Sequence, residues 1–228
     1  MKAKSSKRDI ERTKEKILKA AGSEFAEHGL KGARVDAIAK RAKVNKAMIY
    51  YIFGGKEDLH LAVLKHMIEN KTKPVTEKIN DKSFQAEDLA LLTDRYFDDL
   101  QAVKEYSRII LDDISTGAKA LQQLKAQRPE LFKVVNDVSA IIKSFMDKGH
   151  IYPFDPDIGV MATIMLMVSF SCIQPYMEIV APKGSEAFNN LSDPEKWKHF
   201  IIDLMARFIV IPSPSPTSTE DTSPSADT

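Results

Sequence analysis

A short stretch of the chain places polar side chains where they could contact a polyanion. The stretch is RVDAIAKRAKVNKAMIYYIFGGK, residues 34–56. In it, an amide could read the edge of an adenine, a lysine could bind phosphate as a point charge, and a tyrosine hydroxyl could donate to a phosphate oxygen. The positions left free to meet a partner outside the protein are Asn45, Lys46, Ala47, Tyr50 and Tyr51.

The apolar residues between these positions predict the elements that hold them. They recur with the spacing of two short helices packed across a tight turn, which is a helix-turn-helix. A second helix from Lys46 to Phe53 would then project its polar face into the major groove of DNA. Any helical protein can show so short a pattern, so DNA binding is a hypothesis at this point. The apolar positions are Ile38, Ala39, Val44, Ile49, Ile52 and Phe53.

Charge is unevenly distributed along the 228 residues. Residues 1–56 hold 15 Lys/Arg against 6 Asp/Glu, and the rest of the chain holds 18 against 26. This segregation favours a basic module that binds a polyanion and is attached to a mildly acidic body. A basic amino-terminal segment is, however, often only a solubilising tail.

Apolar residues at three- and four-residue steps predict an all-α protein. We expect a helix at about 9–28, the two short helices of the helix-turn-helix, and a helix from 56 to just before Pro74. Further helices are expected at 86–103, 105–116, 118–127, 129–148, 156–179 and 194–211. The domains are then a three-helix DNA-binding domain over 1–56 and a larger helical effector-binding and dimerisation domain over 57–211. Residues 212–228 include 13 Pro, Ser and Thr and predict a disordered tail.

Several classes of protein are not favoured by the sequence. A single cysteine, Cys172, within an apolar run and the absence of an apolar signal segment fit the cytoplasm. The uncharged run from Ile158 to Ile173 is shorter than a membrane span needs, so we expect a buried helix and no membrane partner. No metal-ligand spacing, Gly-rich phosphate loop or nucleophile motif appears, so we expect no catalytic residue, no metal, no cofactor and no enzyme activity.

The amino-terminal region resembles the tetracycline-repressor (TetR/AcrR) family of bacterial transcription regulators. The similarity begins at Ile17-Leu-Lys-Ala-Ala, passes through His28-Gly29-Leu30 and Val35-Asp-Ala-Ile-Ala39, and ends at Lys56-Glu-Asp-Leu59. It also includes Phe25, Val44, Tyr50 and Phe53. The resemblance covers about 45 residues, and the remaining residues agree only in being helical and of suitable length.

The resemblance implies a homodimer whose recognition helices enter successive major grooves of a roughly palindromic double-stranded operator. Tyr50 and Lys56 match positions that commonly hold the DNA backbone in the family, and Arg34 stands where a capping Thr or Ser usually contacts phosphate. Arg34 can supply that contact but has no oxygen for a cap. Lys43 stands where the turn usually has Gly, at a cost of about 1 to 2 kcal/mol if its backbone is left-handed. Ala47, Met48 and Ile52 also depart from the family pattern.

In the family, the carboxy-terminal half binds a small effector and dimerises. The segments 158–179 and 197–211 fit dimerisation because they are apolar on more than one face. The expected interface residues, which could instead be buried within one subunit, are Met161, Ile164, Met165, Val168, Cys172, Phe200, Leu204 and Phe208. Aromatic and Met side chains suggest a pocket for an apolar or aromatic effector, although such residues are often plain core. They are Tyr96, Phe97, Phe145, Met146, Met167, Phe170, Tyr176 and Met177.

The sequence therefore favours a ligand-responsive DNA-binding regulator, specifically a repressor released from its operator by a small apolar effector. Tilting of the helix from Lys56 to Asn70 would change the separation of the two recognition helices. One alternative is a helical DNA-binding regulator without an effector. The other is a helical adaptor that carries an incidental helix-turn-helix.

Overall fold

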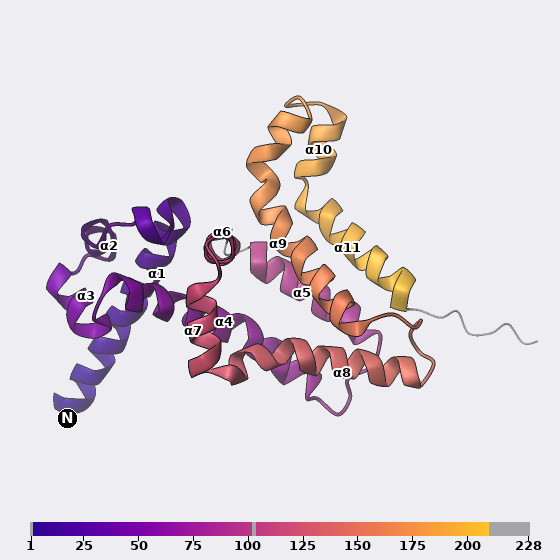
Figure 1. Ribbon diagram of the computed structural model, residues 1–228, viewed down its shortest axis with the longest axis horizontal. Helices are drawn as coiled ribbons and strands as arrows, with labels where there is room; N and C mark the ends of the chain where they lie inside the picture. The colour runs from indigo at the N-terminus through magenta and orange to yellow at the C-terminus, as the bar shows by residue number, and fades with distance from the viewer. Residues whose placement is uncertain (1, 102–103, 210–228) are drawn as a thin grey trace, which may run out of the picture.

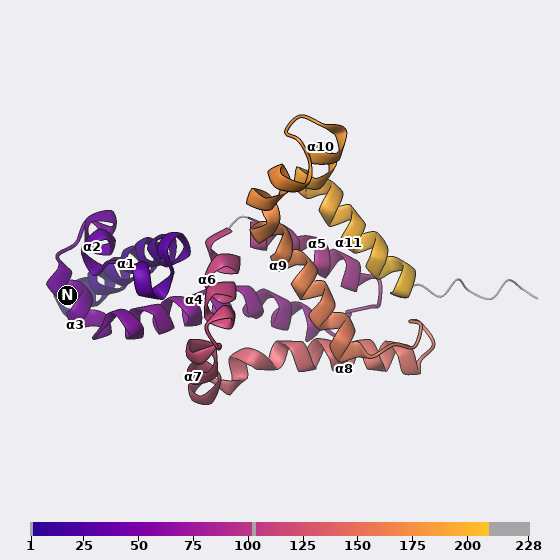
Figure 2. The ribbon, with the colours of Figure 1, turned by 45° about the horizontal axis from the view of Figure 1, so that its top comes forward.

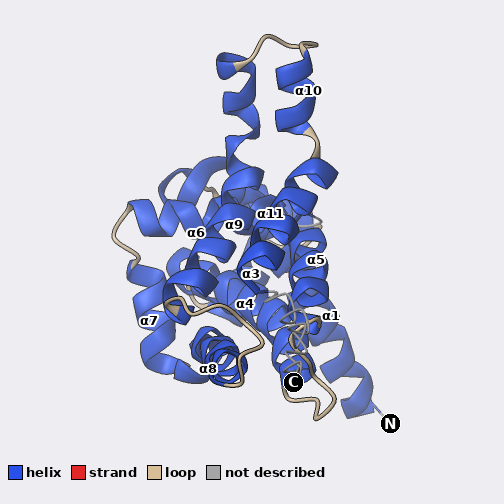
Figure 3. Ribbon diagram, turned by 90° about the vertical axis from the view of Figure 1, so that its right-hand side faces the viewer, coloured by secondary structure: helices blue, strands red, loops and turns tan. Residues whose placement is uncertain are grey.

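The computed structural model describes residues 2–101 and 104–209, and every regular element in these ranges is a helix (Figure 3). The all-α prediction is therefore confirmed. At one end of the molecule lie α1 (Lys2–Gly32), α2 (Val35–Ala42) and α3 (Lys46–Phe53). Figure 1 shows these three helices beside one another at one end of the molecule.

The first helix changes direction at Gly29, where the sequence predicts a helix stop. Gly29 has φ +63° and ψ 174°, so the helical conformation is interrupted there, and one more turn follows to Gly32. The carboxylate of Asp112 lies so close that a Cβ at position 29 would be 3.1 Å from one of its oxygens. Glycine is favoured here both by the positive φ and by this close approach. The predicted bounds of 9–28 are shorter than the observed helix at both ends.

The fourth helix, α4 (Lys56–Ile79), connects the amino-terminal helices to the rest of the protein (Figure 2). We expected it to stop before Pro74, and this expectation is wrong because Pro74 lies inside the helix. Proline removes one backbone hydrogen bond from a helix interior. Val75 and Ile79 follow it and are both buried in a hydrophobic cluster, and this burial favours continuation of the helix.

The body contains seven further α-helices and one short 3-10 helix among the described residues. They are α5 (Asp88–Gln101), α6 (Lys104–Ser115), α7 (Lys119–Gln127), η1 (Pro129–Phe132), α8 (Lys133–Asp147), α9 (Pro156–Val180), α10 (Glu186–Ser192) and α11 (Pro194–Ile209). The carboxylate of Asp155 caps α9 by accepting from two backbone N–H groups, each at 3.0 Å. Asp193 likewise caps α11, and Gly149 has a positive φ beyond α8. The sequence analysis missed α10, whose N-cap is Ser185.

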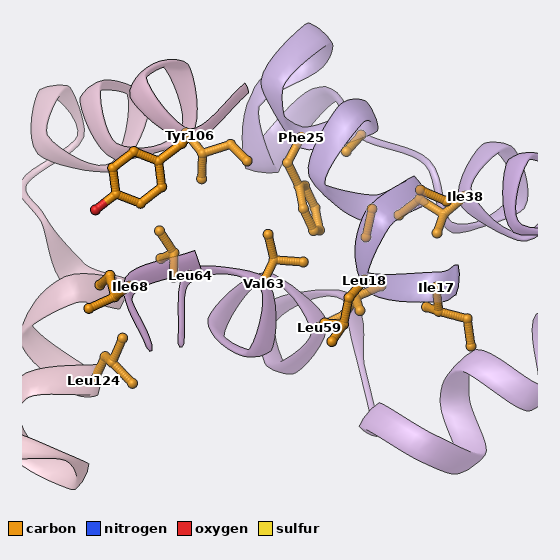
Figure 4. Close-up of a cluster of buried hydrophobic side chains, with 14 of the residues drawn as sticks. Ile17, Leu18, Phe25, Ile38, Leu59, Val63, Leu64, Ile68, Tyr106 and Leu124 are labelled. Atoms are coloured by element: carbon orange, nitrogen blue, oxygen red, sulfur yellow. The ribbon is translucent and has the colours of Figure 1, made fainter. Parts of the chain in front are cut away.

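A continuous hydrophobic cluster joins the amino-terminal helices to the body. Figure 4 shows Phe25 of α1 and Ile38 of α2 close to Leu59 and Val63 of α4, and further along α4 the cluster continues to Tyr106 of α6. A second cluster lies between the carboxy-terminal part of α4, the segment that leads into α5, and helices α8 and α9. Because α4 contributes side chains to both clusters, a displacement of this helix would change the packing in both of them.

The carboxy-terminal part of α9 projects from the body together with α10 (Figures 2 and 3). No helix in the described part of the chain is long and apolar enough to cross a membrane. The predicted tail over residues 212–228 lies outside the described residues, and the division at residue 56 stays a prediction.

Candidate nucleic-acid interface and ligand cavity

Apolar side chains fix α2 against α3, as their spacing predicts. Ile38 and Ala39 of α2 and Ile49 of α3 are buried, and three half-buried residues complete the contact. The half-buried residues are Val44, Ile52 and Phe53. This packing leaves the opposite face of α3 exposed, so the predicted helix-turn-helix is present.

The turn between the two helices contains a left-handed lysine. Lys43 has φ +56° and ψ +46°, and its backbone N–H donates to the carbonyls of Ala39 and Lys40 at the end of α2. The next residue, Val44, donates to the carbonyl of Ala39 at 3.0 Å. The turn therefore has the geometry that glycine usually supplies, and a side chain here strains the backbone.

The outer face of α3 carries most of the predicted DNA-contacting residues. Asn45, Lys46, Ala47, Tyr50 and Tyr51 are all exposed, and Tyr51 is 81% exposed. Asn45 is also the N-cap of α3, because its Oδ1 accepts from the backbone N–H of Ala47 at 2.9 Å. Met48 is exposed on the same short helix, although the sequence analysis did not include it in the site.

The two lysines of the predicted site have different surroundings. Lys46 forms an ion pair with Asp36 of α2, and the hydrogen bond that Lys46 Nζ donates to the Asp36 carboxylate raises the pKa of this lysine. Lys56 is half-buried, and its Nζ donates to the carbonyls of Lys31 and Ala33, each at 3.3 Å. Lys56 therefore satisfies carbonyls near the end of α1, and its role in DNA contact stays a prediction.

Arg34 begins α2 without a side-chain cap, as its chemistry predicts. Its side chain is exposed, and its backbone N–H donates to Glu24 Oε1 at 3.2 Å. Glu24 is only 3% exposed and its other oxygen lies 3.6 Å from the guanidinium of Arg41. The carboxylate of Glu24 thus satisfies the backbone N–H at the start of α2. Glu24 was not among the residues predicted for the site.

Glu24 also belongs to a group of three side chains with metal-ligating atoms. The ligand atoms of Glu24, Glu27 and His28 lie within 4.8 Å of one another. Arg41 makes two hydrogen bonds to Glu27, at 2.8 and 3.0 Å, and these hydrogen bonds lower the pKa of Glu27. The arginine already balances this negative charge, so the group acts as a salt-bridge cluster between α1 and α2.

Polar and aromatic contacts connect α1 to the body. The backbone N–H of Leu30 donates to Asp112 Oδ2 of α6 at 3.4 Å. Nearby, His60 of α4 packs edge-on against Phe25, with ring centroids 4.9 Å apart. His60 is 2% exposed, and neither ring nitrogen has a hydrogen-bond partner among the described residues. Burial lowers the pKa of His60 and thus favours a neutral ring.

A cavity of about 100 Å³ lies in the body between α4, α5, α8, α9 and α11. No charged side chain lines it, and most of its lining is aliphatic. The lining residues are Thr72, Val75, Leu89, Leu92, Thr93, Tyr96, Val134, Val135, Val138, Ile142, Val160, Thr163, Ile164, Met167 and Met205.

Two of the eight predicted effector-pocket residues, Tyr96 and Met167, line this cavity. Phe97 and Phe170 instead pack against each other with ring centroids 5.7 Å apart, and Phe145 stacks on Phe84 in the second cluster. The remaining three also lie outside the lining: Met146 is half-buried, Met177 is buried, and Tyr176 is exposed. The valines and threonines of the wall were not predicted, because their spacing in the sequence does not distinguish a cavity wall from a filled core.

Apolar side chains are exposed along α9, and α11 exposes Phe200. Of the predicted interface residues, Met161, Met165 and Phe200 are exposed, whereas Val168 is buried. Ile164, Cys172 and Leu204 are half-buried, and the side chain of Phe208 lies outside the described part of the structure. Further exposed apolar residues on α9, absent from the prediction, are Ile158, Ile173, Tyr176, Ile179 and Val180.

Comparison with known proteins connects this arrangement to a group of regulators. Residues 17–63 match the family model described as bacterial regulatory proteins, tetR family. The chain is 29% identical over 181 residues to the HTH-type transcriptional repressor SCO4008 of Streptomyces coelicolor, covering 79% of this chain and 88% of that protein. It is 28% identical to the HTH-type transcriptional regulator RutR of Escherichia coli K12, covering 65% of this chain and 69% of that one.

The fold extends the similarity over most of the chain. AibR, solved in complex with isovaleryl coenzyme A and operator DNA, superposes with a TM-score of 0.63 at 16% sequence identity. The superposition covers 87% of this chain and all of AibR. At this identity the comparison establishes a shared fold.

Proposed function

The chain is a DNA-binding transcriptional regulator of the tetR family, and we propose that it is a dimeric repressor released from its operator by a small apolar effector. The observation that carries this proposal is the pairing of an exposed α3 face with an apolar cavity, the two being connected by α4. Val75, at the carboxy-terminal part of α4, lines the cavity, while Leu59, near its start, is buried against α1.

The helix-turn-helix supports operator binding. The exposed amide, lysine and tyrosines on α3 match the chemistry of base edges and phosphates. A single recognition helix reads few base pairs, and a second copy would place two such helices in successive major grooves about 34 to 36 Å apart. The named repressor function of SCO4008 supports repression as the direction of control.

The cavity supports an effector, because a preformed apolar space is the usual basis of small-molecule binding. A ligand there would contact Thr72 and Val75 of α4 directly. A displacement of α4 would move the recognition helices of a dimer apart or together, and half-sites of fixed spacing tolerate little such change. Coupling of about 1 to 3 kcal/mol would change operator affinity about 5- to 150-fold.

The exposed face of α9 and α11 supports a second copy as the partner. Apolar side chains exposed on two helices are costly to leave in water, and a twofold dimer buries the same patch of both subunits. Exposed apolar side chains continue along the carboxy-terminal part of α9, and this favours helix-to-helix contact between the copies. Figure 1 shows this part of α9 projecting from the body.

Selection of bound duplexes from a random DNA pool with the full-length protein tests operator binding. The expected product is an inverted repeat whose half-sites are about one helical turn apart. The affinity of the selected duplex is then measured for Tyr51→Ala and for the control Lys125→Ala, which alters an exposed lysine on α7. We expect a loss of binding only for Tyr51→Ala. Failure to enrich any inverted repeat would overturn the proposal of a dimeric operator-binding protein.

A further inference from the structure

We infer that the effector is an amphiphile with an aliphatic chain and an anionic head group, whose head lies at Lys71, Lys78 and Arg95 and whose chain occupies the cavity. This inference rests on the proposed function, because it assigns the chemistry of the same ligand site. It is carried by three hollows that share lining residues: a basic one, the apolar cavity and a larger apolar chamber.

The cavity itself selects for hydrocarbon. Its polar side chains include three threonines whose hydroxyls are already engaged with backbone carbonyls of their own helices. Thr72 donates to Ile68 at 2.9 Å, and Thr93 donates to Leu89 at 2.8 Å. Thr163 donates to the carbonyl of Gly159 at 2.9 Å. A polar or charged ligand group placed here would lose its hydration with little compensation from these hydroxyls.

The size of the cavity limits how much of a ligand it can hold. Its volume of about 100 Å³ is below the roughly 150 Å³ of an engineered cavity that holds benzene. Its wall carries one aromatic residue, Tyr96, and several β-branched residues whose side chains are stiff. An aromatic ring would require these walls to move. The space holds only a few methylene groups, so a longer unbranched chain must continue into an adjoining space.

A basic hollow adjoins the cavity on the side of α4 and α5. It measures about 80 Å³ and shares Val75, Leu92 and Tyr96 with the cavity, so these three residues form the wall between the two spaces. The charged residues that line the hollow are all cationic: Lys71, Lys78 and Arg95. A ligand that passes this wall would meet hydrocarbon on one side and three positive charges on the other.

The cations differ in how far the protein already balances them. Lys78 lies 3.3 Å from Asp88 and 5.9 Å from the centre of the Phe84 ring. Arg95 is exposed and has no ion-pair partner among the side chains that the structure describes. Its guanidinium can present two parallel N–H donors to a carboxylate or a phosphate, so Arg95 is the principal head-group ligand in this proposal.

A larger chamber adjoins the opposite side of the cavity. It measures about 350 Å³ and shares Ile142, Thr163 and Met205 with the cavity. Thr163 Oγ1 lies 2.9 Å from the sulfur of Met205, so this pair stands between the two spaces. Methionine has a flexible unbranched side chain, and its rotation would let a longer chain continue into the chamber. Met205 is thus placed to set the accepted chain length.

The chamber also fixes the orientation of the ligand. Asp155 is the one charged residue in its lining, and the Asp155 carboxylate already accepts from the backbone N–H groups of Asp157 and Ile158. An anionic head at this end would be repelled, whereas the methyl end of a chain would meet a lining that is otherwise mostly apolar. Charge therefore places the head at the basic hollow and the chain end near Met205.

Isothermal titration of the full-length protein tests the ligand class without DNA. The probes are hexanoate, decanoate and tetradecanoate, their coenzyme A thioesters, and decanol as a neutral chain of matched length. We expect at least one anionic series to bind at least tenfold more tightly than decanol. Binding of the free acids assigns a carboxylate head, and binding of the thioesters alone assigns a phosphate-bearing head. Equal binding of decanol, or binding by neither anionic series, would overturn the inference.

Variants localise the two ends of the ligand. Arg95→Gln is expected to weaken the anionic probes about tenfold, the effect of losing one charge-assisted hydrogen bond, and to leave decanol unchanged. The control Arg108→Gln alters an exposed arginine on α6 outside the basic hollow. Met205→Phe is expected to abolish tetradecanoyl binding and retain hexanoyl binding. Unchanged affinities in Arg95→Gln would overturn the head-group assignment. An unchanged preference for chain length in Met205→Phe would overturn the proposed role of Met205 in setting the accepted chain length.

Operator release separates this inference from the proposed function. If the anionic amphiphiles bind but leave the affinity of the selected operator unchanged, the ligand assignment stands and the effector role fails. If the operator is bound and no amphiphile binds, the DNA-binding part of the proposed function stands and the ligand assignment fails.

Discussion

Asp36 and Lys46 join the exposed faces of α2 and α3, with Asp36 Oδ1 2.9 Å from Lys46 Nζ. The pair lies on the surface that we assign to DNA, and the side chain of Asp36 is 74% exposed. An exposed ion pair of this kind contributes little to folding. Its larger effect is on binding, because the carboxylate both holds the lysine and repels phosphate.

Replacing either partner should change DNA affinity in opposite directions. We expect Asp36→Asn to tighten operator binding several-fold, and Lys46→Met to weaken it and to lower the slope of log affinity against log salt by about one. Fluorescence anisotropy over a series of KCl concentrations measures both effects. The control Lys125→Met removes a lysine on α7 and should change neither. Weaker binding of Asp36→Asn would show that the ion pair orients Lys46 productively.

The helix-turn-helix was predictable from sequence because its packing is local. The apolar positions from Ile38 to Phe53 repeat with the helical period, so one face must be buried and the other exposed. The left-handed turn at Lys43 was expected only from the resemblance, because Lys43 stands where the family usually has Gly. Glu24 was not predictable, because its bond to the N–H of Arg34 depends on how α1 crosses α2.

The cavity could not be predicted residue by residue. Phe97 and Phe170 have the same helical pattern as Met167, yet they fill a packed core whereas Met167 faces a space. The difference depends on how α5, α8 and α9 approach one another, which local spacing does not encode. Pro74 misled the helix prediction for a similar reason, since burial of Val75 and Ile79 favours a helix that local preference would end.

The left-handed backbone of Lys43 predicts a stabilising substitution. Lys43→Gly should relieve a strain of about 1 to 2 kcal/mol. The greater freedom of glycine in the unfolded chain offsets about 0.5 to 1 kcal/mol of this gain. We expect a net gain of about 0 to 1.5 kcal/mol, and for a chain of this size each kcal/mol raises Tm by about 2 to 4 °C. Calorimetry without DNA measures it.

The matched control is Lys40→Gly, which introduces glycine within α2 and should cost about 1 kcal/mol. If both substitutions destabilise the protein by the same amount, the Lys43 side chain contributes more to the free energy of unfolding than its backbone strain costs.

Buried His60 predicts a loss of stability in mild acid. Burial lowers its pKa in the folded protein, while nearby Asp113 and Asp112 oppose this effect less strongly. The unfolded chain has the ordinary His pKa of about 6.5 and therefore takes up the proton first as the pH falls. Below that pH, the free energy of unfolding should decrease by up to about 1.4 kcal/mol per pH unit, until the folded-state pKa is reached.

Urea denaturation at about pH 7.5 and about pH 5.5 measures this dependence. We expect His60→Leu to reduce the difference in unfolding free energy between the two conditions, because no group at position 60 then takes up a proton. His66→Gln, at an exposed position on the same helix, should retain it. An equal pH dependence in the wild type and in His60→Leu would assign the acid sensitivity to other groups.

A charge on the exposed face of α9 should separate the proposed dimer. Met165 lies on this face and is partly exposed, and in a twofold interface each Met165→Glu substitution would bury a carboxylate without a partner. Sedimentation equilibrium should then give the mass of one chain, and operator affinity should fall because the two half-sites are no longer bound together. The control Ile114→Glu alters an exposed apolar residue on α6, and we expect it to leave both measurements unchanged. A dimer that persists in Met165→Glu would place the interface elsewhere. A monomer that still binds the full operator with unchanged affinity would contradict the requirement for two recognition helices.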